Sequence, residues 1–178
     1  MSETSHGGSG GLGGTLVGLV RRLPGFRGYF ELEERRASDT LLREHLASEL
    51  ERAKRSTDQA ARGLADAGLI DPLPQFDQLR GQIDRVTARL RGAPRGYSGL
   101  FDLRRVDAKL LEDIYAHDQT LIDQVNTFRT LVDGWASGPQ AAVSGLAEAR
   151  QKLDLIDRGC DARADLLKRF VESHSQAT

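Results

Sequence analysis

The sequence predicts an all-α fold, an antiparallel bundle of four main helices arranged as two helical hairpins, and three observations indicate it. Apolar residues recur at every third or fourth position through most of the chain after residue 40, which is the period of a helix with one buried face. Aromatic residues make up only 6% of the 178 residues, so Leu, Ala, Val and Ile must build the core, as suits helices packed on helices. Short connectors that contain proline and glycine separate the helical stretches and make successive helices antiparallel neighbours.

The N-terminus divides into two parts. Residues 1–14 are rich in glycine and predict a disordered tail. Residues 15–27 form a short amphipathic segment in which apolar residues share one helical face and arginines lie beside it. These residues are Leu16, Leu19, Val20 and Leu23, with Arg21, Arg22 and Arg27. Three interpretations remain open: the segment docks on its own protein or is disordered, it docks on a partner protein, or it lies on a membrane surface with its arginines at the lipid phosphates.

The first helical hairpin is predicted between residues 28 and 92. Its first helix runs from about Tyr29 to Ala67, and Gly68 is placed to end it. Asp71–Pro74 is the connector, because two closely spaced prolines do not fit a helix interior. The apolar face of the second helix consists of Phe76, Leu79, Ile83, Val86 and Leu90. The first helix is much longer than the second, so the N-terminal segment, the 92–105 loop or another subunit must cover its surplus length. From this mismatch we expect self-association or a partner helix.

The second hairpin completes a single helical domain over residues 28–174. A loop over residues 92–99 precedes it, and Asp107 is the predicted N-cap of a third helix over residues 108–136. Gly138–Pro139 predicts a turn, after which the fourth helix runs to about Ser173. An Arg-Gly-Tyr block precedes each hairpin; chance, packing at the hairpin ends and a shared partner surface are the interpretations left open.

The charge distribution excludes one function class and suggests one candidate surface. The net charge of −1 argues against a general nucleic-acid-binding protein, because such proteins carry a clear basic excess. Residues 80–105 are nevertheless rich in arginine, and they form either a solvated surface or a docking patch for an acidic partner or a phosphate surface. The candidate residues of this loop docking patch are Arg91, Arg95, Tyr97, Phe101, Arg104 and Arg105.

The cysteine content and hydropathy predict the cellular setting. The single cysteine, Cys160, allows no disulfide within the chain, so a reducing compartment is expected, and we interpret Cys160 as a core residue. No stretch approaches the ~20 apolar residues of a membrane span, and the N-terminus lacks the basic region of a secretory signal. The expected location is the cytoplasm, either free or peripheral to the inner face of the membrane. Arginine greatly outnumbers lysine, which is typical of a GC-rich bacterial genome.

No catalytic chemistry is predicted. A carboxylate-bridged metal site in a helical bundle would need Glu-x-x-His pairs, and the sequence has only Asp113 with His117 and His45 with Glu49, four residues apart. We interpret His117 as a core residue that Asp113 or Asp118 orients; a metal-dependent enzyme centred on it is the weaker hypothesis. No catalytic or cofactor-binding motif occurs, so no catalytic residue and no cofactor are predicted.

Two resemblances accompany this interpretation. The block Leu23–Tyr29, followed by a Glu-rich helix with an Arg-Arg pair, resembles the start of small bacterial helical-bundle proteins of unknown function, and residues 107–118, with Tyr115 and His117, are similar to their later half. This resemblance implies a helical fold and no particular activity. The basic amphipathic N-terminus before long helices is also similar to phage-shock-type membrane-surface proteins, although prolines break the helices of this chain into shorter ones.

These features together predict a non-catalytic interaction or scaffold protein that acts by helix-face docking. The alternative is a peripheral membrane-surface protein that uses residues 15–27. For the scaffold function, the expected contact elements are the Leu16–Leu23 segment and the 92–105 loop.

Overall fold

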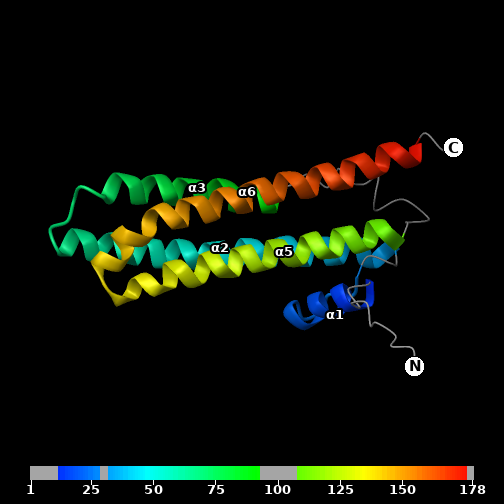
Figure 1. The fold of residues 1–178 in the computed structure, drawn as a ribbon, viewed down its shortest axis with the longest axis horizontal. Helices are drawn as coiled ribbons and strands as arrows, with labels where there is room; N and C mark the ends of the chain where they lie inside the picture. Colours follow the sequence, from blue (N-terminus) through cyan, green and yellow to red (C-terminus); the bar gives the residue numbers. More distant parts are fainter. Residues whose placement is uncertain (1–11, 29–31, 93–107, 176–178) are drawn as a thin grey trace, which may run out of the picture.

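The computed structural model describes residues 12–28, 32–92 and 108–175, and within these ranges the chain is helical almost throughout, with no strand. The elements are α1 (Leu12–Arg22), α2 (Leu32–Asp66), α3 (Leu73–Gly92), α5 (Ala108–Asp133), the 3₁₀-helix η1 (Gly134–Ser137) and α6 (Pro139–Ser175) (Figure 1). The all-α prediction is confirmed. The predicted tail up to residue 11, most of the predicted loop and the predicted N-cap Asp107 lie outside the described residues.

The first helix begins earlier than predicted. α1 starts at Leu12, so Gly13 and Gly14 are helical and do not belong to a disordered tail. The N–H groups of a first helical turn have no partner within the helix, which is why weak helix formers are tolerated there. The predicted stop is confirmed, because α1 ends before Pro24 and Gly25, and Gly25 has a φ of 91°.

The end of α2 follows the sequence prediction. Gly68 has a φ of 72°, in the left-handed region that favours glycine. Its N–H donates to the carbonyl of Ala65 at 3.0 Å, and the N–H of Leu69 donates to the carbonyl of Leu64 at 2.9 Å. These two bonds satisfy carbonyl groups that the helix end would otherwise leave without partners.

The turn before α6 is tighter than predicted. The sequence predicts a third helix that reaches residue 136. In the structure α5 ends at Asp133, and the chain continues through η1. Trp135 in η1 is buried beside Phe76, with ring centroids 5.4 Å apart, so the tighter turn brings the indole into the core. Gly138, with a φ of 141°, donates its N–H to the carbonyl of Trp135, and Pro139 is the first residue of α6, as predicted.

The four long helices pack against one another along one hydrophobic core. α2 packs on α3 and α5, α5 packs on α6, and α3 packs on α6, whereas α1 packs on α5 at the outside (Figure 1). The fully buried side chains are mostly aliphatic, with Phe76, Tyr115 and Phe128 as the largest aromatic members. The predicted apolar faces therefore do form the core.

Part of the surplus length of α2 is buried within this same chain. α2 has 35 residues and α3 has 20. The ion pairs Lys54–Asp84 and Asp58–Arg80 show that the two helices run antiparallel, so the first turns of α2 extend past the end of α3. In that extension Leu42 is nevertheless 0% exposed. Ala37 and Thr40 of the same extension are exposed, and the expectation of self-association or a partner helix stays a prediction.

Candidate functional site

The amphipathic face of α1 is docked on α5. Leu19 and Leu23 are 0% and 1% exposed, and Phe26, just after the helix, is also buried. The ring of Phe26 meets that of Tyr115 edge to face, with centroids 6.2 Å apart. Two of the predicted docking residues, Leu19 and Leu23, therefore contact their own protein in this structure.

Two contacts define how α1 lies on α5. The guanidinium of Arg22 forms an ion pair with Asp123. One turn earlier in both helices, a Cβ atom added to Gly18 would lie 2.0 Å from Nε2 of Gln119. The two helices therefore run in the same direction, and Gly18, which weakens an isolated helix, permits their close approach.

The opposite side of α1 faces solvent. Val17 and Val20 are 57% and 46% exposed, and Arg21 is also exposed. Leu16 is half-buried against the core, and Arg27 is exposed beyond the turn. The predicted docking segment is thus divided, with its leucines directed toward α5 and its valines and Arg21 directed outward.

The weak metal candidates, His117 and Asp113, lie in different environments. His117 is half-buried, and its Nε2–H donates to the carbonyl of Gly159 at 2.9 Å, so this nitrogen carries a proton and offers no lone pair to a metal. Asp113 is exposed. Within the described ranges, no three His, Cys, Asp or Glu side chains gather closely enough to hold a metal ion.

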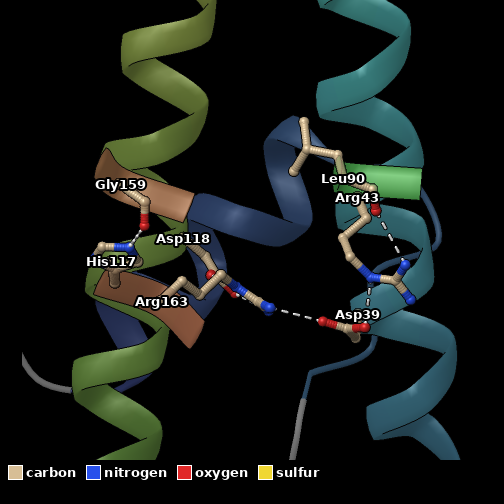
Figure 2. A network of polar contacts seen from close by, with 7 residues as sticks. All are labelled: Asp39, Arg43, Leu90, His117, Asp118, Gly159 and Arg163. Atoms are coloured by element: carbon tan, nitrogen blue, oxygen red, sulfur yellow. Dashed lines mark hydrogen bonds and ion pairs between the residues drawn. The ribbon is translucent and has the colours of Figure 1, made fainter. Parts of the chain in front are cut away.

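A buried ion-pair cluster, Asp39–Asp118–Arg163, joins α2, α5 and α6 (Figure 2). Arg163 of α6 donates from Nε to Asp118 of α5 at 2.6 Å and from Nη1 to Asp39 of α2 at 2.8 Å. Asp118 is 0% exposed, and Asp39 and Arg163 are 5% and 7% exposed. One cation therefore serves two buried carboxylates from two other helices.

The cluster extends to the fourth long helix. Asp39 also accepts from Nε of Arg43 at 2.8 Å, and Nη1 of Arg43 donates to the carbonyl of Leu90 at 3.2 Å (Figure 2). That carbonyl belongs to the last turn of α3, where helix carbonyls lack internal partners. A continuous chain of polar contacts thus crosses α5, α6, α2 and α3 and fixes their relative register.

The sequence prediction missed this cluster because it assigned the wrong residue to the apolar face of α5. The face was traced through His117, yet Asp118 continues the spacing from Ile114 to Leu121 and is the buried residue. Asp118 pairs with Arg163 from this buried position. The sequence did contain a signal for a buried charge. Arg163 follows Cys160 by three residues and precedes Leu167 by four, so it lies on the apolar face of the last helix.

The arginine-rich surface is largely paired where the structure describes it. Arg91 forms ion pairs with Glu44 and Glu51 of α2. Arg89 pairs with Asp157 at 2.6 Å and with Asp161 at 2.8 Å. The remaining residues of the predicted loop docking patch lie outside the described residues: Arg95, Tyr97, Phe101, Arg104 and Arg105. The patch therefore stays a prediction.

In comparisons with known proteins, no family model, no curated protein and no solved structure matches the chain. None of the described helices combines the length and apolar composition needed to cross a membrane.

Proposed function

We propose that α2, α3, α5 and α6 form an antiparallel four-helix bundle that serves as a non-catalytic scaffold, with α1 as its exchangeable docking helix. In the docked state α1 covers the surface of α5. When α1 leaves, that surface accepts an amphipathic helix of a partner protein, in the manner of other helix-in-groove complexes. With Cys160 as its single cysteine, the proposed setting is the reducing cytoplasm.

The observation that carries this proposal is the small attachment of α1. The helix has 11 residues and packs on α5 alone among the described elements. Helices of this length are marginal in isolation, so α1 depends on burying Leu19 and Leu23, and each fully buried leucine contributes roughly 1.5–3 kcal/mol. An element held by so few contacts exchanges more readily than the helices it covers.

A second candidate function, binding to an anionic membrane surface, is favoured by the outward face of α1. Val17 and Val20 are exposed beside Arg21, and release from α5 would add Leu19 and Leu23 to this apolar surface. An amphipathic helix with flanking arginines is the usual composition of an interfacial helix.

The first experiment asks whether α1 docks as a separable ligand. A chain that starts at Tyr29 is titrated with a fluorescent peptide of residues 12–28, and fluorescence anisotropy is measured. We expect saturable binding that Leu19→Asp in the peptide abolishes and that Val17→Asp leaves unchanged, because Leu19 is buried and Val17 is exposed. Equal binding by both variant peptides, or no binding by a folded truncated chain, would contradict the proposal.

Vesicle flotation separates the two candidate functions. Full-length protein and the chain from Tyr29 are floated with anionic and with neutral vesicles. Flotation that requires both residues 1–28 and anionic lipid would assign α1 to membranes. If the full-length protein does not float and the truncated chain binds the peptide of residues 12–28, α1 would be assigned to protein partners.

A further inference from the structure

Exposed apolar side chains occur in two close pairs in the described part of the chain. Five large apolar side chains are exposed there: Val17, Val20, Leu69, Ile70 and Leu155. Val17 and Val20 are three residues apart on the outward face of α1, and Leu69 and Ile70 are adjacent in the turn between α2 and α3. Single exposed apolar residues such as Leu155 are ordinary, but grouped ones are typical of interaction surfaces.

The turn between α2 and α3 holds its apolar pair in a fixed position. Ile70 is 65% exposed and Leu69 is 41% exposed. The N–H of Leu69 is bonded to the carbonyl of Leu64, and the N–H of Leu73 donates to the carbonyl of Ile70 at 3.1 Å. A partner that binds here therefore has little backbone to order, and this lowers the entropic cost of association.

The two apolar pairs have charges of opposite sign beside them. Arg21 is exposed next to the pair on α1, whereas Asp66 and Asp71 are exposed on either side of the pair in the turn. Arg62, also exposed, lies one turn before Asp66 and offsets part of its charge, so Asp71 is the stronger acidic contact. The two surfaces are thus complementary in charge, and both are apolar at their centre.

The two surfaces lie on different parts of the molecule. The turn between α2 and α3 is at one end, and α1 lies toward the other (Figure 1). One copy can therefore use both surfaces at once, on two different neighbours. A contact between unlike surfaces is heterologous, and it continues from copy to copy as a chain or closes as a ring.

We propose that copies of this protein associate head to tail, with the outward face of docked α1 in one copy bound to the turn between α2 and α3 of the next. Val17 and Val20 bury against Leu69 and Ile70, and Arg21 meets an acidic side chain that flanks the turn. A contact of this small size gives weak, reversible association. Anionic lipid suits the turn less well, because its flanking aspartates repel it. The inference goes beyond the proposed function, because α1 stays docked on α5.

Sedimentation equilibrium of the full-length protein tests this arrangement. The average mass should rise with concentration and pass the mass of a dimer, because each copy carries both surfaces. Val17→Asp on α1 and Ile70→Asp in the turn should each stay monomeric. An equimolar mixture of these two variants should form a dimer and nothing larger, because only one complementary pair of intact surfaces remains.

Leu155→Asp is the matched control, because Leu155 is 47% exposed on α6, outside both surfaces. It should associate like the original protein, and circular dichroism should show every variant to be folded. A monomer mass at all concentrations, a mixture of variants that stays monomeric, or an equal loss in Leu155→Asp would overturn the proposal.

A second pair of variants tests the charged contact. Arg21→Asp should weaken the association, whereas Arg85→Asp should leave it unchanged, because Arg85 is an exposed arginine on α3 outside both surfaces. Equal association of both variants would overturn the role of Arg21. Binding of the Val17→Asp peptide to the truncated chain shows separately whether α1 still docks on α5, so failure of head-to-tail association is distinguishable from failure of helix docking.

Discussion

Arg163 illustrates how one side chain holds several helices in register. Its charge is balanced by Asp39 and Asp118, which approach it from α2 and α5. Replacement of one partner in a buried ion pair leaves the other charge without compensation in a poorly solvated site. We therefore expect Arg163→Met to lower the free energy of unfolding by about 3–5 kcal/mol, as measured by urea denaturation.

Arg85→Met is the matched control for that measurement, because Arg85 is an exposed arginine on α3. Substitutions at exposed positions usually change stability by less than about 0.5 kcal/mol. Similar losses in the two variants would show that the buried cluster contributes nothing specific.

Gly145 and Gly63 are both helical glycines, yet they should respond to alanine with opposite signs. A Cβ at Gly145 would lie 2.6 Å from Nε1 of the rigid Trp135 indole, whereas a Cβ at Gly63 would meet no atom within 4 Å. Overpacking costs about 1–3 kcal/mol, partly offset at Gly145 by the ~1 kcal/mol that alanine gains over glycine in a helix. Urea denaturation should therefore show Gly145→Ala less stable and Gly63→Ala more stable than the original protein.

His45 should give the protein an acid-sensitive contribution to stability. Burial lowers the pKa of His45 below its usual 6.5; neighbouring Glu49 raises it less than burial lowers it, and Arg52 lowers it further. The folded state thus binds this proton less tightly than the unfolded state, so the contribution is complete above pH 6.5 and is lost as the pH falls through the lowered pKa. His45→Gln should flatten the decline of unfolding free energy between about pH 7 and 5; a decline as steep as before would contradict this assignment.

At the scale of single elements, α1 should open independently of the helices beneath it. It packs on one neighbour only, contains three glycines in 11 residues and keeps one face in solvent. In native-state hydrogen exchange, α1 amides should exchange about a hundredfold or more faster than amides at the centre of α5, because local release costs far less than global unfolding. Equal protection in the two helices would show that α1 is an integral part of the core and would weaken the exchange proposal.

The helix ends at Gly68 and Pro139 were predictable, but the contacts between helices were not. Gly68 and Pro139 act through their own backbone conformation, so local sequence alone placed the turns correctly. The docking of α1 was one of three open interpretations, because the residues that receive it on α5 lie about a hundred positions further along the chain. Arg163 and Asp39 are 124 residues apart, and the apolar periodicity carries no information about such a pair.

At the scale of the whole molecule, one continuous core should make the long helices unfold together. The single tryptophan, Trp135, lies in η1 beside Phe76, and the turn between α5 and α6 lies at the opposite end of the molecule from α1 (Figure 1). Tryptophan fluorescence therefore reports on one end, whereas far-ultraviolet circular dichroism averages over the full length. Urea transitions followed by the two signals should coincide, and Arg163→Met should shift both midpoints equally. Different midpoints for the fluorescence and circular-dichroism transitions would show that the molecule unfolds as two cooperative units.

The buried cluster also constrains how the sequence can change over evolutionary time. Loss of any one of Asp39, Asp118 and Arg163 removes a buried ion pair and changes the charge balance of a poorly solvated site, whereas joint replacement by apolar residues of similar volume is often tolerated. Descendants of the same ancestor should therefore carry either all three charges or none, and mixed sets should be rare. Such a correlated triple, spread across most of the chain, would mark distant relatives even where the remainder of the sequence has diverged beyond alignment.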